Sequence, residues 1–142
     1  MYSTNTPAIR VVIVDDDEKL VSKLRTTMEI QSGFEVLGSA GTLADAYAML
    51  KHQKPDIALV DLGLPDGSGL DLIRFIHSNQ PHCETVVLSV FTDESNLIAS
   101  IEAGATGYLT KDSTTPEILA RLQQLKAGGS PISPVIARQL LN

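Results

Sequence analysis

Acidic side chains follow two apolar segments of the sequence at the point where each segment ends. Asp15 and Asp16 come directly after the run at residues 11–14, and Asp61 follows a second run at residues 57–60. If both runs are parallel strands of one sheet, their carboxyl ends open on the same edge, where open α/β sheets bind ligands. Carboxylates gathered there repel one another unless a cation lies between them. The sequence therefore predicts a divalent metal ion at this edge.

Two further polar groups follow later apolar segments. Ser89 ends the segment at residues 85–89, and Lys111 lies two residues beyond the segment at residues 107–109. A hydroxyl, an ammonium group and a metal ion are the parts that phosphoryl transfer requires, because each can hold an oxygen of the transferred group. With these groups around it, Asp61 is the expected phosphoryl acceptor.

The elements that must position these groups alternate along the chain. Short apolar runs, typical of strands buried on both faces, lie at residues 9–14, 35–39, 57–61, 85–89 and 107–109. Amphipathic segments with helical spacing lie at residues 18–31, 43–52, 70–78, 94–103 and 116–126. Five such repeats predict an α/β fold, a doubly wound five-stranded parallel sheet with right-handed crossovers and helices on both faces.

Local signals mark the expected helix ends and turns. Gly104 follows a helical segment at a position that favours glycine. Gly67 and Gly69 are interpreted as turn glycines, because neither the Walker spacing nor the dinucleotide-binding spacing is present. Asp17 and Glu18 are expected to stabilise the positive end of the first helix dipole.

Composition limits the classes of function that the chain can have. Its 142 residues suit one domain, and its net charge of -6 argues against a nucleic-acid-binding surface. The single Cys83 cannot form an internal disulfide, and residues 1–10 lack the apolar core of a signal peptide. No apolar stretch approaches the roughly 18 residues of a membrane span. We therefore expect a cytoplasmic protein that does not insert into a membrane.

The ordered motifs resemble the receiver domains of bacterial two-component response regulators, over about residues 9–127. An acidic pair follows the first strand, and Asp61 stands in the sequence DLGLPDGSG after the third strand. Ser89 ends the fourth strand, and the sequence GYLTKD, with Tyr108 and Lys111, covers the fifth. The resemblance implies a flavodoxin-like sheet with strand order 2-1-3-4-5, for which a chemotaxis receiver is an established example.

The resemblance also implies a role for each matching acidic residue. Asp16, Asp61 and the backbone carbonyl of Gly63 would bind Mg²⁺, and Asp15 would assist through a water molecule. Asp61 would accept the phosphoryl group from a sensor histidine kinase. The domain would catalyse only its own phosphorylation and dephosphorylation, so we do not expect a conventional enzyme.

Two residues of the resemblance are expected to act as a switch. Ser89 and Lys111 would bind phosphoryl oxygens, and Tyr108 would turn inward when Ser89 moves toward the phosphate. This movement would reshape the face of the fourth helix and fifth strand, which is the expected output.

Gly63 and Val90 depart from common family choices and predict a long-lived phosphoryl group, because Val90 narrows the approach of water and Gly63 cannot orient it.

The remaining residues are expected to lie outside the receiver domain. Residues 1–8 would form an N-terminal tail, and residues 128–142 a linker with a short helix at residues 134–141. The linker sequence AGGSPISPVIARQLL further resembles NarL/FixJ-type regulators, in which a LuxR-type helix-turn-helix domain follows. We expect that domain to be missing here, so that this chain alone does not bind DNA and the regulator would contact DNA only through the missing domain. Phosphorylation is expected to promote a homodimer or to control the missing domain.

Other classes of protein share some of these features. A stand-alone receiver could relay phosphoryl groups or regulate a protein partner, and a degenerate receiver could act as a binding module without phosphorylation. The presence of Asp16, Asp61 and Lys111 argues against the degenerate form. A haloacid dehalogenase type phosphatase also has an acidic signature after its first strand, but Lys19 stands where that signature normally has Thr or Val.

Overall fold

The structure is a computed structural model that describes residues 7–90 and 93–128. The expected C-terminal helix at residues 134–141 lies outside the described residues, as does most of the expected N-terminal tail.

A five-stranded parallel sheet forms the centre of the molecule. Its strands lie in the order β2-β1-β3-β6-β7, and every neighbouring pair in it is parallel. The strands are β1 (Ile9–Val14), β2 (Phe34–Ala40), β3 (Ile57–Val60), β6 (Glu84–Ser89) and β7 (Gly107–Thr110). Counted within this sheet alone, the order is 2-1-3-4-5, so the predicted strand order is confirmed. A separate hairpin of two short strands, β4 (Gly63–Leu64) and β5 (Gly67–Ser68), follows β3.

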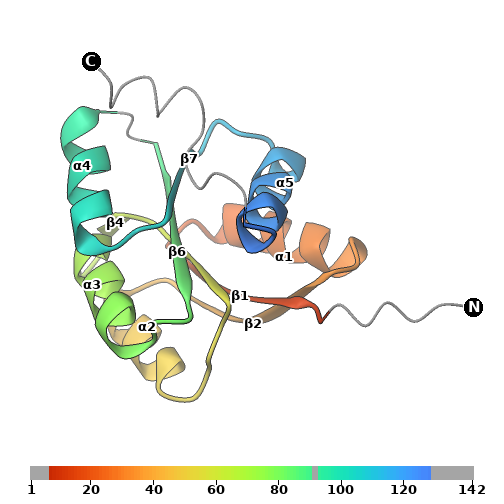
Figure 1. The fold of residues 1–142 in the computed structure, drawn as a ribbon, viewed down its shortest axis with the longest axis horizontal. Helices are drawn as coiled ribbons and strands as arrows, with labels where there is room; N and C mark the ends of the chain where they lie inside the picture. Colours follow the sequence, from red (N-terminus) through yellow and green to blue (C-terminus); the bar gives the residue numbers. More distant parts are fainter. Residues whose placement is uncertain (1–6, 91–92, 129–142) are drawn as a thin grey trace, which may run out of the picture.

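Helices cover both faces of the sheet, which confirms the predicted doubly wound fold. One face carries two helices and the other carries three (Figure 1). The first group is α1 (Glu18–Ile30) and α5 (Thr115–Lys126), and the second is α2 (Leu43–Leu50), α3 (Gly69–Asn79) and α4 (Glu94–Ala103). No helix in the described part of the chain is long and apolar enough to span a membrane.

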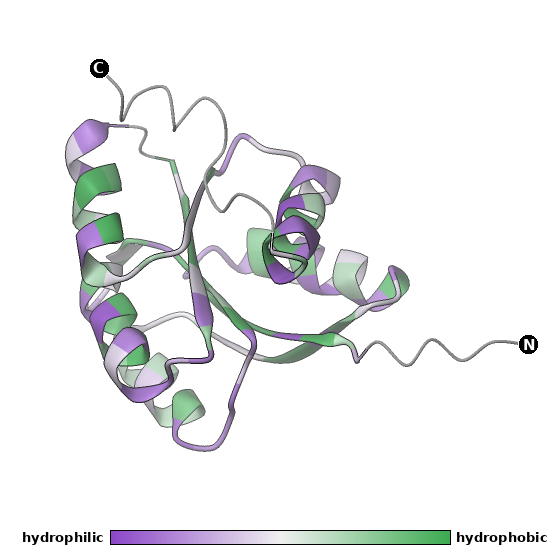
Figure 2. Cartoon of the chain, in the orientation of Figure 1, coloured by the Kyte–Doolittle hydropathy of each residue, from purple (hydrophilic) through white to green (hydrophobic). Residues whose placement is uncertain are grey.

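The core has two halves because strand side chains alternate between the two faces. Val12 and Val14 of β1 pack in the half under α2, α3 and α4, whereas Val11 and Ile13 pack in the half under α1 and α5. All four side chains are buried. Apolar residues accordingly concentrate on the strands and on the inner sides of the helices (Figure 2). Burial of this apolar surface is the main force that holds the layers together.

Helix ends follow the expected local signals with one exception. Asp17 caps α1 by accepting the backbone N–H of Leu20 at 3.2 Å, and Gly104 ends α4 with a left-handed φ of 115°. The prediction that Gly69 is a turn glycine is wrong, because Gly69 is the first residue of α3. Its lack of a side chain serves close packing instead, since a Cβ at this position would lie 2.2 Å from the backbone oxygen of Asp61.

Candidate functional site

Three carboxylates meet at the carboxyl edge of the sheet, as the strand ends predicted. Asp15 follows β1 and Asp61 follows β3, and these two strands are neighbours. Backbone hydrogen bonds extend both strands into the site, because the N–H of Asp61 donates to the carbonyl of Val14 at 2.9 Å. One oxygen from each of Asp15, Asp16 and Asp61 lies within 4.8 Å of the others. Asp15 and Asp61 are buried, whereas Asp16 is exposed.

Lys111 brings one positive charge into this group. Its Nζ lies 2.8 Å from Oδ2 of Asp15 and 3.4 Å from Oδ2 of Asp61. The backbone N–H of Lys111 donates to the carbonyl of Ser89 at 2.8 Å, which fixes the start of the loop after β7. Burial lowers the pKa of the ammonium group, but the two carboxylates outweigh burial and raise its pKa above the ordinary value.

The negative charge around Asp61 is larger than the single positive charge of Lys111 can neutralise. Burial raises the pKa of this carboxyl group, and the nearby charge of Asp15 raises it further. Lys111 and the N–H of Gly63, which donates to Oδ1 of Asp61 at 3.5 Å, lower the pKa only in part. The net direction is upward, so the ionised form of Asp61 gains from any additional positive charge at the site.

Asp15 supplies a second sign that the site suits a cation. Its Oδ1 accepts the N–H of Asp17 at 2.9 Å. Its Oδ2 is buried and is contacted by the ammonium group of Lys111 at 2.8 Å. One ammonium group thus serves the buried carboxylates of both Asp15 and Asp61, so part of their negative charge stays uncompensated. Three close carboxylate oxygens with this excess of negative charge fit Mg²⁺, which prefers oxygen ligands.

Ser89 and Tyr108 lie inside the molecule next to the site. Ser89 is the last residue of β6 and is buried, and Tyr108 of the neighbouring β7 is only 1% exposed. Burial raises the pKa of the Tyr108 hydroxyl, while a hydrogen bond with Ser89 partly lowers it. Tyr108 is therefore buried and in direct contact with Ser89 in this structure.

Gly63 and Val90 both lie at the rim of the site. A side chain at Gly63 would meet no atom within 4 Å, so space remains open beside the acceptor loop. Val90 is 68% exposed and borders a cavity of about 350 Å³ together with Thr110, Lys111 and Asp112.

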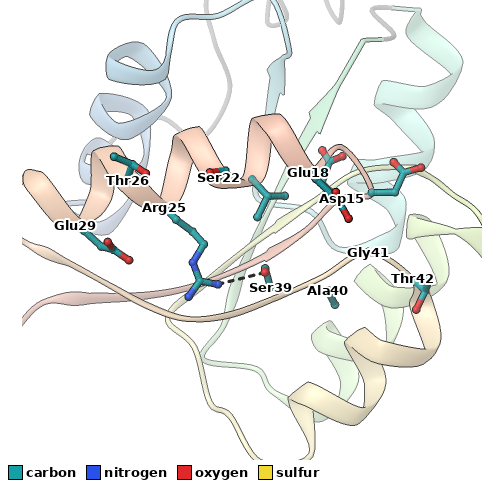
Figure 3. A pocket seen from close by; sticks show the side chains of 12 residues that line it. Asp15, Glu18, Ser22, Arg25, Thr26, Glu29, Ser39, Ala40, Gly41 and Thr42 are labelled. Carbon is teal, nitrogen blue, oxygen red and sulfur yellow. Dashed lines mark hydrogen bonds between the residues drawn. The ribbon is translucent and has the colours of Figure 1, made fainter.

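A larger cavity of about 580 Å³ extends from the acidic edge along α1 (Figure 3). Asp15 and Glu18 lie toward one end of it and Glu29 toward the other. Arg25 of α1 crosses it, and its Nη1 donates a hydrogen bond to Oγ of Ser39 in β2 at 3.3 Å. No local pattern in the sequence predicts this cavity, because it forms only where α1 lies over β2.

The response regulator receiver domain family matches residues 11–123. The chain is 32% identical to the DNA-binding transcriptional activator DevR/DosR of Mycobacterium tuberculosis, over 94% of this chain and 61% of that protein. It is 35% identical to the photosynthetic apparatus regulatory protein RegA of Cereibacter sphaeroides, over 87% of this chain and 65% of that protein. The chain thus spans less than two thirds of the length of these two relatives.

A solved structure agrees over the same region. A LuxR-family two-component response regulator from an Aurantimonas species matches with a TM-score of 0.84 and 28% identity, over 92% of this chain and 94% of that one. The family match includes all five strands of the main sheet from residue 11 onward, together with the three carboxylates and Lys111. This chain therefore belongs to the family of response regulator receiver domains, whose members are regulators rather than conventional enzymes.

Proposed function

We propose that this chain is the phosphoryl-accepting receiver domain of a transcriptional response regulator and that Asp61 is the residue phosphorylated. The position of Asp61 supports this assignment, because its Oδ2 lies 3.4 Å from the ammonium group of Lys111 and two further carboxylates stand beside it. Membership of the family makes a sensor histidine kinase the expected phosphodonor. Such an exchange takes place in the cytoplasm.

The metal ion of this proposal is Mg²⁺. Asp16, Asp61 and the backbone carbonyl of Gly63 would hold it, with Asp15 contacting it through water. When bound, the cation neutralises the carboxylates and the phosphoryl oxygens during transfer. The excess of carboxylates over the single ammonium group of Lys111 and the raised pKa of Asp61 support a site for positive charge here.

Each side chain has a separate task in the transfer. A carboxylate oxygen of Asp61 attacks the phosphorus atom of the donor, and the bond between that phosphorus and the donor atom breaks as the acyl phosphate forms. The ammonium group of Lys111 and the hydroxyl of Ser89 each hold a phosphoryl oxygen. Water later hydrolyses the acyl phosphate in the same site, so the domain forms and loses its own modification without acting on other substrates.

The output of the domain is proposed to pass through Ser89 and Tyr108. Movement of Ser89 toward the phosphoryl group would change the packing of Tyr108 and so alter the surface of α4 and β7. We propose that this surface controls a homodimer or a DNA-binding helix-turn-helix domain linked through residues 128–142. The name of the relative DevR/DosR, a DNA-binding transcriptional activator, supports transcription as the output. Residues 9–127 would then be the receiver domain, and residues 1–8 a tail.

Labelling with a small phosphodonor tests the proposal. Wild-type protein incubated with acetyl phosphate and Mg²⁺ should gain one phosphoryl group by intact mass spectrometry, and chelation of Mg²⁺ should prevent the gain. Asp61→Asn should remove it. Asp71→Asn provides the matched control, because Asp71 is an exposed carboxylate on α3 that pairs with Arg74 at 3.0 Å, and this variant should label normally. Equal labelling of the Asp61→Asn variant would contradict the assignment.

A further inference from the structure

The hairpin after the acceptor makes a contact with α2 that the proposed function does not include. Pro65 and Asp66 form the two-residue loop between β4 and β5. The carboxylate of Asp66 accepts the N–H of Leu43 at 2.7 Å through Oδ1 and the N–H of Ala44 at 3.1 Å through Oδ2. Leu43 and Ala44 are the first two residues of α2. A side chain from the acceptor loop therefore caps a helix that begins 23 residues earlier in the chain.

The contact is favourable for two physical reasons. The first backbone N–H groups of a helix have no partner within the helix, and negative charge is stabilised near that end. The helix has its own cap in Thr42, whose Oγ1 accepts the N–H of Asp45 at 3.1 Å. Asp66 thus binds the two N–H groups that Thr42 leaves free. The same hydrogen bonds hold the pKa of the Asp66 carboxyl group below its usual range, so it is ionised at neutral pH.

A second contact presses the hairpin against the same helix. Gly67 lies so close to Leu43 that a Cβ at position 67 would stand 2.7 Å from Cδ1 of Leu43, and its φ of 153° also favours glycine. Leu43 and Leu64 are both buried in the same half of the core. The hairpin is therefore attached to α2 by a charged group and by apolar packing.

The hairpin transmits this attachment to the acceptor. Gly63 pairs with Ser68, and Leu64 pairs with Gly67. The loop that carries Asp66 thus closes a short antiparallel ladder whose far end is Gly63. Gly63 in turn donates its N–H to Oδ1 of Asp61. A change in the position of Asp66 is therefore expected to move the backbone of Gly63, including the N–H that contacts Asp61.

We propose that Asp66 is a positioning residue whose carboxylate clamps the hairpin to the start of α2 and so holds the backbone of Gly63 in place for the metal ion. This inference rests on the proposed function, because it assumes that the carbonyl of Gly63 is a ligand of Mg²⁺. Partners that orient metal ligands in this way typically change metal affinity by about 10- to 100-fold when removed. Loss of the clamp should act first on Mg²⁺ binding and only through it on phosphorylation.

Two substitutions at the same helix end separate positioning from helix stability. Asp66→Ala removes the clamp, whereas Thr42→Ala removes the local cap of α2 and leaves the hairpin contacts intact. Both variants should lower the melting temperature. Mg²⁺ titrations followed by calorimetry should show a Kd raised about tenfold in Asp66→Ala and unchanged in Thr42→Ala. Labelling by acetyl phosphate should be slow in Asp66→Ala at low Mg²⁺ and return to the wild-type rate at saturating Mg²⁺.

The conservative variant Asp66→Asn extends the test, because its side-chain amide keeps one oxygen that can accept a hydrogen bond from α2. Asp66→Asn should have a Kd for Mg²⁺ between those of the wild type and Asp66→Ala. In Mg²⁺-free protein, the amides of residues 63, 64 and 66–68 should exchange with deuterium faster in Asp66→Asn than in the wild type or in Thr42→Ala. A Kd and exchange rate equal to those of the wild type in both Asp66 variants would overturn the inference. A wild-type protein that neither binds Mg²⁺ nor labels would instead refute the proposed function, while the exchange comparison would still decide whether Asp66 holds the hairpin.

Discussion

At the scale of single residues, the site is defined by an imbalance of charge. Three carboxylates share one ammonium group, and Lys111 lies closer to Asp15 than to Asp61. The pKa of Asp61 is raised by burial and by Asp15, which means that ionising Asp61 in the folded protein costs free energy. A cation bound beside Asp61, or the phosphorylation that removes its negative charge, would relieve this unfavourable free energy.

The first prediction concerns stability without divalent cations. The pKa of Asp61 is higher in the folded than in the unfolded chain, so protonation of this carboxyl group favours the folded state. This contribution to the free energy of unfolding is fully present below the ordinary pKa of 3.8 and is lost as the pH rises through the folded-state pKa. Asp61→Asn should therefore be more stable than the wild type in chelator at pH 7. Urea unfolding should show this advantage shrinking as the pH is lowered toward 4. A less stable variant at pH 7 would mean that the pair with Lys111 outweighs burial.

The second prediction concerns the close contact below the acceptor. A Cβ at Gly69 would lie 2.2 Å from the backbone oxygen of Asp61 and 3.0 Å from Cγ1 of Val60. Gly69→Ala must therefore displace the acceptor strand and should lower the free energy of unfolding by about 1–3 kcal/mol. It should also slow labelling of Asp61. Gly63→Ala is the control for stability, because its added Cβ meets no atom within 4 Å, and an equally large loss in that variant would contradict the steric explanation.

The third prediction concerns Val90 at the rim of the site. Val90 is 68% exposed and borders the cavity beside Lys111, which places its side chain where water could approach. Val90→Ala should shorten the lifetime of the phosphoryl group by widening that approach. The decay should be followed by mass spectrometry after removal of the phosphodonor. An unchanged or longer lifetime would refute the steric role of Val90.

At the scale of elements, the helices on one face differ in how deeply they are anchored. In α3, Leu72, Ile73 and Ile76 are completely buried large side chains. In α4, the buried set contains one large apolar residue, Leu97, beside the smaller Ser100 and Ala103. Ile98 and Ile101 of α4 remain 39% exposed. The helix proposed to carry the output is thus the more weakly packed of the two.

The fourth prediction follows from this difference. Because local opening costs less where fewer apolar contacts are broken, backbone amides of α4 should exchange with deuterium faster than those of α3 in unmodified protein. Phosphorylation should change exchange in α4 and β7 more than in α3. Hydrogen–deuterium exchange mass spectrometry can measure both. Equal protection of the two helices would contradict the packing argument.

At the scale of the whole molecule, negative charge is concentrated as well as abundant. The chain carries a net charge of -6, and three of its carboxylates share one edge of the sheet. A cation that binds only the folded form stabilises it by mass action, by about 2.7 kcal/mol at a concentration 100 times its Kd. Folding and metal binding should therefore be linked in this protein.

The fifth prediction is a direct consequence of that linkage. Saturating Mg²⁺ should raise the melting temperature of the wild type on the order of 10 °C, as measured by calorimetry. Asp16→Ala should abolish most of the response, because it removes an exposed carboxylate of the cluster without opening a core cavity. Asp71→Ala should keep the full response. Indifference of the wild type to Mg²⁺ would count against the metal site.

Much of the architecture was predictable because it follows from local patterns. Apolar runs ending in Val14 and Val60 predicted buried parallel strands, and the residues after them had to meet at one edge because parallel strands end on the same side. The approach of Asp15, Asp16 and Asp61 was therefore expected from sequence. The strand order was not derivable from these patterns and came from the family resemblance.

The tertiary structure decided the contacts between parts of the chain that carry no local signal of each other. The clamp of Asp66 on Leu43 and the packing of Gly69 under Asp61 depend on how the hairpin turns back over α2 and β3. The sequence showed Asp66 and Gly69 only as members of a turn-like motif. Periodicity identifies which face of an element is buried, but it contains no information on which distant backbone groups lie within 3 Å of a given carboxylate. That distance is set by the packing of the whole domain.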